Sequence, residues 1–350
     1  MDRVLSPTIA SAPISSTSTS SLVILGGGPA GAIAALTALR EGSPVSLIER
    51  ATFPKHKVCG EFLSPEIVPV LESAGVLERF LDARPWLVRT MSVSIGSREK
   101  RARLPEPAYG LSRFTYDNML WSEAMGRGAV AVETGTPNVI TSGRPAGTTG
   151  KGMRLFGFKA HFEGPADDAV QLYFLRNAYV GINCIEEGRT NVCGLAPEAM
   201  LKEVGFEPEA LFATSPPLHD RLKPLQRNMR WLFTGPLEFR QQWKETTTYR
   251  AGDALSFVDP FTGSGLLCAA VTGSLAGLHA ARKVSVEAHL QSCRQAIGKP
   301  FLFSSVLRSL AGTDWAERLI GFVPGQLLYR LTRPQARLSA IKPAFSGFLR

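Results

Sequence analysis

The chain has 350 residues, of which 44% are hydrophobic and 20% charged, a composition typical of a globular protein long enough for two domains. Its formal net charge of +9 would suit nucleic acid, an anionic membrane or a phosphorylated cofactor. No nucleic-acid-binding motif accompanies the charge, so we expect no nucleic-acid partner. The cysteines form no C-x-x-C pair, which predicts neither a metal site nor a disulfide framework and favours a reducing compartment, the cytoplasm. They are Cys59, Cys184, Cys193, Cys268 and Cys293.

The N-terminal segment is rich in small polar residues. Residues 6–21 contain ten Ser or Thr and no continuous apolar core, which predicts a disordered tail over residues 1–20 rather than a signal peptide. No run of apolar residues is long enough for a membrane span.

A strand, a glycine-rich loop and a helix follow in immediate succession. Residues 22–25 are predicted to be a buried strand, residues 32–40 a helix and residues 45–48 a second strand, so the unit reads as βαβ. Between the first strand and the helix lies the G-x-G-x-x-G loop, Gly26-Gly27-Gly28-Pro29-Ala30-Gly31.

Each glycine of the G-x-G-x-x-G pattern has a physical role in binding a dinucleotide. Gly26 permits the tight turn, Gly28 lets the backbone approach a pyrophosphate, and Gly31 lets helix and strand pack closely. The helix start, with Pro29 and Ala30, offers N–H groups and a partial positive charge to phosphates. Glu49, followed by Arg50, ends the second strand at the distance expected for a carboxylate that binds a ribose. The loop alone does not distinguish FAD from NAD.

A second glycine-rich segment lies in the last third of the chain. Residues 246–249 are predicted to be a strand, and residues 266–281 an apolar helix. Between them stand Gly252-Asp253-Ala254 and the pattern Pro260-x-x-Gly263-x-Gly265. The helix start at Leu266 again offers backbone donors.

Four motifs together carry a resemblance to a known superfamily. Gly252-Asp253 with Pro260-x-x-Gly263-x-Gly265 resembles the ribityl-binding motif of FAD-dependent aromatic hydroxylases, tryptophan halogenases and geranylgeranyl reductases. The segment 53–61, with Cys59 and Gly60, is similar to the P-x-x-K-x-C-G-E stretch of the last two groups, and Arg113-Phe114-Thr115-Tyr116-Asp117 resembles their R-x-x-(F/Y)-D helix start. With the first loop, these motifs span about three quarters of the chain.

The resemblance implies FAD as the cofactor, with NAD(P)H as a candidate electron donor. It implies an α/β fold, in which a Rossmann-like FAD-binding domain of the glutathione reductase/p-hydroxybenzoate hydroxylase type carries an antiparallel-sheet substrate domain and C-terminal helices. By the same resemblance Glu49 binds the adenosine ribose and Asp253 the ribityl or phosphate region. Gly263, Gly265 and Leu266 then lie near the flavin pyrimidine edge.

The expected division places the FAD-binding domain in residues 21–85, 105–150 and 245–295. Residues 86–104 and 151–244 form the substrate-covering sheet, because short alternating strands recur there at 153–162, 170–175, 178–184 and 191–195. Residues 296–350 form a helical region. Nine basic and two acidic residues between 294 and 350 leave open a peripheral contact with a membrane surface beside the plain alternative of a solvated basic face.

The sequence departs from the superfamily in two places. No Asp-Gly motif occurs near residues 139–144, and the stretch 128–140 is short, which weakens the expectation of NADPH use more than that of FAD binding. The W-x-W-x-I-P signature of tryptophan halogenases is absent, so we do not expect halogenation.

The sequence offers few candidate catalytic side chains. Cys59 is the candidate catalytic residue, because the resembling loop passes near the flavin ring, although a buried and inert cysteine is the commoner case. Lys57 suits a phosphate or a solvated loop, and Arg113 suits cofactor fixation because its charge is permanent. His161, in an alternating strand, is either an acid facing the ring or a hydrogen-bonded strand histidine.

Three functions stay open at this level. The first is reduction of a carbon–carbon double bond in a hydrophobic, prenyl- or polyketide-like small molecule by reduced flavin. The second is hydroxylation of an aromatic substrate by a flavin monooxygenase. The third is a degenerate FAD-binding accessory protein.

Overall fold

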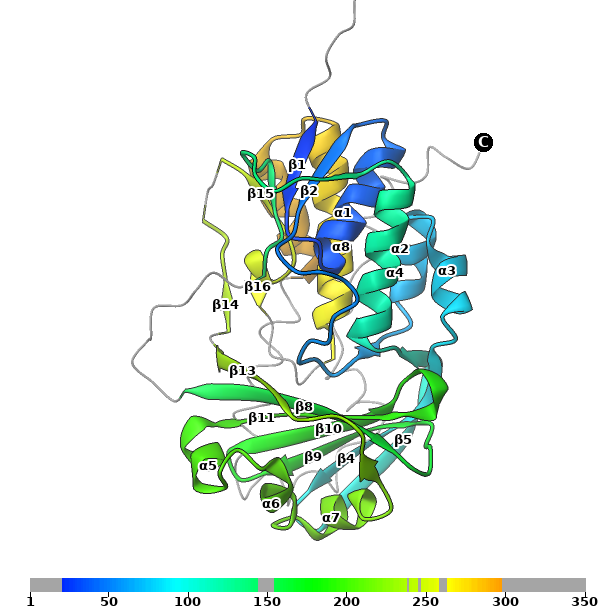
Figure 1. The fold of residues 1–350 in the computed structure, drawn as a ribbon, viewed down its shortest axis with the longest axis vertical. Coiled ribbons are helices and arrows are strands. Elements are labelled where there is room, and N and C mark those ends of the chain that lie inside the picture. Colours follow the sequence, from blue (N-terminus) through cyan, green and yellow to red (C-terminus); the bar gives the residue numbers. More distant parts are fainter. Residues whose placement is uncertain (1–20, 144–153, 238, 245–246, 258–262, 298–350) are drawn as a thin grey trace, which may run out of the picture.

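The computed structural model describes residues 21–143, 154–237, 239–244, 247–257 and 263–297. Two groups of helices and sheets lie one above the other (Figure 1). The expected tail, Pro260 and all but the first two residues of the expected C-terminal helical region lie outside the described residues, so the division into domains stays a prediction.

The first group is built on a parallel sheet of short strands in the order β15-β7-β1-β2-β6. The predicted βαβ unit is confirmed, because β1 and β2 pair in parallel and α1 connects them. The short stretch after residue 128 supplies the edge strand β6, which pairs with β2, and the inner strand β7, which pairs with β1. The strands are β1 (Leu22–Leu25), β2 (Val45–Ile48), β6 (Val130–Ala131), β7 (Val139–Ile140) and β15 (Tyr249–Arg250).

Helices pack on this sheet through small residues. The helix α1 (Pro29–Arg40) contacts both α4 (Arg113–Gly126) and α8 (Gly265–Ala281), and all three share one buried apolar core with the sheet. The predicted helix 266–281 is thus confirmed with one further residue at its start. Two short helices complete the group, α2 (Ile67–Ser73) and α3 (Leu77–Asp82).

The second group is a larger sheet in the order β12-β8-β11-β10-β9-β4-β5-β3, with β13 also paired to β8. All these pairs are antiparallel except β4 with β9. The four strands predicted between residues 153 and 195 are confirmed as β8 to β11. The strands are β3 (Phe62–Leu63), β4 (Trp86–Ile95), β5 (Arg98–Gly110), β8 (Leu155–Glu163), β9 (Ala169–Leu175), β10 (Ala178–Cys184), β11 (Thr190–Pro197), β12 (Gln226–Arg227) and β13 (Leu232–Leu237).

Alternation along β8 gives the large sheet two different faces. Phe158, Ala160 and Phe162 enter an apolar core beneath the sheet, which the helices α5 (Glu198–Glu203), α6 (Pro208–Phe212) and α7 (Pro216–Leu222) cover (Figure 1). Gly157, Lys159 and His161 therefore face the parallel-sheet group. The remaining elements are β14 (Arg240–Gln241), paired with β16 (Ser256–Phe257), and the 3₁₀ turns η1 (Glu186–Gly188) and η2 (Gly252–Ala254).

Candidate cofactor and substrate site

A cavity of about 1180 Å³ lies between the two groups. Its lining comes from the glycine loop, the loop after β2, the start of α4, the η2 turn and the start of α8, and from strands β8, β10, β11 and β13 of the large sheet. The cavity therefore joins the two halves of the predicted cofactor site to the face of the large sheet.

The glycines of the first loop differ in whether the fold would tolerate a side chain at their position. Gly26 has φ 109°, and a Cβ on Gly31 would lie 1.8 Å from the Gly26 carbonyl oxygen, so both are required by the fold itself. Gly28 has no such constraint, because the nearest atoms to a Cβ there are Lys57 Nζ at 3.8 Å and an Arg113 terminal nitrogen at 4.0 Å. Gly28 thus leaves space for a group bound from outside, as its role at a pyrophosphate requires.

Two cations flank that space. Arg113 binds Asp117 through two hydrogen bonds of 2.5 and 2.7 Å, and Lys57 Nζ lies 4.0 Å from the same carboxylate. Burial alone would lower the pKa of Arg113, but Asp117 raises it overall; burial and the neighbouring Arg113 lower the pKa of Lys57. With the α1 N-terminus, these side chains form a positively charged cradle beside Gly28, suited to phosphate oxygens.

The carboxylate predicted to bind ribose is held at the end of β2. Glu49 accepts hydrogen bonds of 2.8 Å from the backbone N–H groups of Gly27 and Ala51, and it lines the cavity together with Arg50. Its position next to the glycine loop is the one that the ribose role requires.

The second glycine segment reaches the same cavity from α8. Gly252 has φ 59°, and a Cβ there would lie 2.9 Å from Ala30, which brings η2 directly against α1. Asp253, Gly263, Gly265 and Leu266 line the cavity, and a Cβ on Gly265 would meet no atom within 4 Å. The residues present therefore fit a dinucleotide lying between the two glycine segments.

The structure brings the predicted binding residues together. Those that line the cavity are Gly26, Gly28, Pro29, Ala30, Glu49, Arg50, Cys59, Gly60, Arg113, Gly252, Asp253, Gly263, Gly265 and Leu266. Gly31 serves packing behind the loop, and Pro260 lies outside the described residues. The individual binding roles, and the catalytic role of Cys59, stay predictions.

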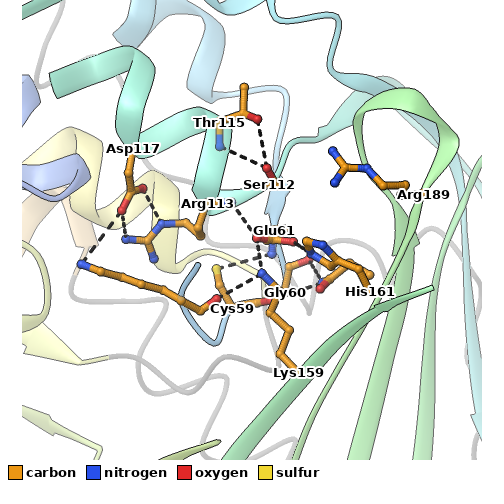
Figure 2. A network of polar contacts seen from close by, with 12 residues as sticks. Cys59, Gly60, Glu61, Ser112, Arg113, Thr115, Asp117, Lys159, His161 and Arg189 are labelled. Carbon is orange, nitrogen blue, oxygen red and sulfur yellow. Dashed lines mark hydrogen bonds and ion pairs between the residues drawn. The ribbon is translucent and has the colours of Figure 1, made fainter. Parts of the chain in front are cut away.

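The largest feature that the sequence interpretation missed is a buried polar network around Glu61 (Figure 2). The Glu61 carboxylate, which has no exposed surface, pairs with Lys159 Nζ, accepts the Arg113 backbone N–H at 2.6 Å and lies 2.7 Å from His161 Nε2. Burial alone would raise the pKa of Glu61, but Lys159 and His161 bring it below its usual range. His161 is thus a hydrogen-bonded strand histidine.

A second missed carboxylate positions α4. Glu186 is 5% exposed and accepts from the Ser112 backbone N–H at 2.8 Å, Ser112 Oγ at 2.5 Å and Thr115 Oγ1 at 2.8 Å. Ser112 in turn is the N-cap of α4 and accepts from the Thr115 N–H. Only the Ser-x-x-Thr spacing at a helix start hinted at this arrangement.

The part of the cavity farthest from the glycine loops is apolar. Gly157 of β8 lies closely against Val58, Thr234 and Leu237 there, and a Cβ would approach these side chains to 3.2–3.5 Å. The other apolar side chains of this floor are Tyr179, Leu195, Leu232, Phe233 and Phe257. Within the described ranges, no group of three or more His, Cys, Asp or Glu side chains is placed to hold a metal ion, and no helix there is both long and apolar enough to cross a bilayer.

Comparisons with known proteins agree with this geometry. The FAD binding domain family matches residues 19–138. A menaquinone reductase of Mycobacterium tuberculosis is 46% identical over 55 residues, which are 16% of this chain and 14% of that protein, so the aligned stretch spans about a seventh of that relative.

Two solved structures share the fold over almost their whole length. The flavin-dependent brominase Bmp2 has a TM-score of 0.71 at 18% identity, covering 89% of this chain and 92% of its own. A geranylgeranyl bacteriochlorophyll reductase-like protein of Thermoplasma acidophilum has a TM-score of 0.70 at 19% identity, covering 93% and 96%. Residues 19–138 therefore match an FAD binding domain, and the chain as a whole shares its fold with these two solved proteins.

Proposed function

We propose that this chain is an FAD-dependent oxidoreductase that reduces a carbon–carbon double bond in an apolar, prenyl- or polyketide-like substrate. One observation carries the proposal: a single cavity joins the dinucleotide cradle at Gly28 to the apolar floor around Gly157. The names of two of the similar proteins, a menaquinone reductase and a geranylgeranyl bacteriochlorophyll reductase-like protein, support reduction of a lipid-like molecule.

Reduced FAD would supply a hydride, and the chain would orient the cofactor and the substrate and exclude water. Lys57, Arg113 and the α1 N-terminus bind the phosphates, which fixes the cofactor along the cavity. The apolar floor binds the substrate by removing its surface from water and keeps competing water away from the reacting carbon.

The test begins with the bound cofactor. The purified protein is denatured, and the released flavin is identified by chromatography and mass; FAD is the expected result. The reloaded protein is then reduced without oxygen by NADPH, NADH or dithionite and mixed with a menaquinone or with geranylgeraniol. A product in which a carbon–carbon double bond of the prenyl chain has gained two hydrogens, formed as the oxidised flavin spectrum returns, supports the proposal, whereas reduction of the menaquinone ring to the quinol alone does not.

The other candidate functions give different outcomes. A product that has gained one oxygen atom, formed only in air, would establish the monooxygenase instead. Bound FAD that accepts electrons from dithionite but passes them to no substrate would favour the accessory protein. NAD(P)H is the donor only if it reduces the flavin at a rate that rises with its concentration.

A further inference from the structure

The segment 57–61 lines the cavity, and two buried side chains of the large sheet donate hydrogen bonds to its backbone. Lys159 Nζ on β8 donates to the Lys57 carbonyl at 3.2 Å. Asn191 Nδ2 on β11 donates to the Cys59 carbonyl at 3.2 Å and to the Gly60 carbonyl at 2.9 Å. Both side chains have no exposed surface, so these three carbonyl groups are fixed toward the sheet.

Fixing the carbonyl groups also fixes the neighbouring N–H groups. A trans peptide is planar, with its N–H opposite its C=O, and the peptides that follow Lys57 and Cys59 are trans. The N–H groups of Val58 and Gly60 therefore point away from the sheet. Within the described residues neither N–H has a hydrogen-bond acceptor, although both residues line the cavity. A Cβ on Gly60 would meet nothing within 4 Å, so the space beside it is open.

The far end of the segment is anchored by Glu61. Its φ of 52° is in the left-handed region, which a non-glycine residue adopts only where surrounding contacts hold it. Here the contacts are the pair with Lys159 and the hydrogen bond from the Arg113 N–H. Lys159 thus holds both ends of the segment, through the Lys57 carbonyl and through Glu61.

Asn191 retains its orientation at a cost. Its Oδ1 is buried and, among the described residues, has no hydrogen-bond partner. An unsatisfied buried amide oxygen calls for an explanation, and the orientation that leaves it unsatisfied is the one in which Nδ2 binds the Cys59 and Gly60 carbonyl groups.

We propose that Asn191 and Lys159 are positioning residues that hold the Val58 and Gly60 N–H groups toward the cavity as a pair of donors. The pair binds a carbonyl oxygen that gains negative charge during reduction, either on the cofactor's ring system or on the substrate. Fixed donors stabilise such charge because they need no reorientation when it develops. The inference rests on the proposed function and adds to it the side chains that form this donor site.

Asn191→Leu is the main test, because leucine is similar in size to asparagine but cannot donate either anchoring hydrogen bond. Asn191→Ala is the second variant, in case the branched side chain does not fit. Asn183→Leu is the matched control: Asn183 lies opposite Asn191 on β10, is 3% exposed and, among the described residues, donates to the Cys184 carbonyl and to no atom of the segment. Each variant is loaded with FAD, and folding is checked by circular dichroism.

The first measurement is the midpoint potential of the bound FAD, without substrate. If the donors bind the cofactor, the Asn191 variants lose about tenfold of the preference for reduced over oxidised flavin, a fall of about 30 mV for a two-electron couple. The Asn183 variant keeps the wild-type potential.

The second measurement tests whether the carbonyl oxygen belongs to the substrate and not to the cofactor. The dissociation constant of menadione, a quinone, is measured from the change in the flavin absorbance. If the donors bind the substrate, the Asn191 variants bind menadione about tenfold more weakly while their flavin potential stays unchanged.

Wild-type potential and wild-type menadione affinity in folded Asn191 variants would overturn the inference and leave the proposed function standing. The same result follows if Asn183→Leu changes either quantity as much as Asn191→Leu. A wild-type protein that binds no FAD would instead overturn the proposed function.

Discussion

A single carboxylate, Glu61, connects three parts of the molecule. It pairs with Lys159 and His161 of the large sheet, accepts the first N–H of α4, and is itself the last residue of the segment 57–61 that lines the cavity. A buried charge of this kind depends on its partners, because its removal leaves the opposite charge without compensation.

We therefore expect Glu61→Gln to lower the free energy of unfolding by about 3–5 kcal/mol, since Lys159 would keep a buried charge with no counter-ion. Urea denaturation measures the change. Glu163→Gln, at the exposed end of β8, is the matched control and is expected to change the free energy by less than about 0.5 kcal/mol. A Glu61 variant as stable as the control would mean that the pair does not hold these elements together.

Gly28 is the position where cofactor binding and folding can be separated. Among the described residues, the atom nearest to a Cβ at this position is Lys57 Nζ at 3.8 Å, and the Cβ would lie at the cavity. We expect Gly28→Ala to fold normally and to bind FAD about tenfold more weakly or worse, because the methyl group meets the phosphates. A fluorescence titration with FAD measures the affinity.

The control for that variant is Gly126→Ala, at the end of α4, where a Cβ would also meet nothing within 4 Å but the cavity is distant. It should keep the wild-type affinity for FAD. Equal affinity in the Gly28 and Gly126 variants would show that no phosphate approaches Gly28.

At the scale of whole elements, the crossing of α1 and α8 decides where the two glycine segments meet. A Cβ on Gly273 would lie 2.3 Å from the Ala30 carbonyl oxygen, and one on Gly277 would lie 2.2 Å from that of Ala34. The two helix backbones are therefore in direct contact, and α8 carries the second glycine segment against the first.

Gly277→Ala should lower the free energy of unfolding by about 1–3 kcal/mol, because an extra methyl group must push the helices apart. Gly273→Ala, which displaces Ala30 at the start of α1, should in addition weaken FAD binding. Thermal melting with and without FAD distinguishes the two effects. Two variants that melt like wild type would show that the helices are not this close.

Some strands and helices were predictable because their sequence pattern lies within a few consecutive residues. The strands β1, β2 and β8 to β11 carry their alternation or apolar runs in a few consecutive residues, and α8 carries its small apolar residues in one stretch. The strand expected at 246–249 instead lies at Tyr249–Arg250, since pairing with β7 through Val139 and Ile140 sets its register. A two-residue strand has too few residues to show a pattern of its own.

At the scale of the molecule, the chain after α8 is held by a pair of histidines. His289 Nε2 lies 2.9 Å from the Arg250 carbonyl and must donate to it, so its Nδ1 accepts from His279 Nδ1 at 3.2 Å. Protonation of His289 at Nδ1 would place its new N–H opposite the N–H that His279 Nδ1 donates. Burial, His289 and Arg282 lower the pKa of His279 to about 4, and burial lowers that of His289.

Because the unfolded chain, with histidine pKa near 6.5, binds protons more readily than the folded one, stability is lost as the pH falls from about 6.5 toward 4. We expect the melting temperature to fall across this window. His279→Gln, which can still donate to His289 but does not titrate there, should flatten the slope. Parallel slopes for both proteins would exclude the histidine pair as the cause.

The two glycine segments of the predicted cofactor site could be recognised in the sequence. The G-x-G-x-x-G loop, the acid at the end of the second strand and the glycines before α8 each act through local backbone geometry, which neighbouring residues specify. They could therefore be recognised, and of the residues predicted to bind the cofactor all but Gly31 and Pro260, the latter outside the described residues, line the cavity.

The polar network on the side of the large sheet depends on contacts between residues far apart in the chain. Glu61 meets Lys159 98 residues later, and Gly60 meets Asn191 131 residues later. Which residues of two strands lie side by side depends on the register of the whole sheet and on how that sheet faces the cofactor group. A buried lysine, asparagine or glutamate looks like any polar residue in the sequence, because its partner is chosen by folding rather than by its neighbours.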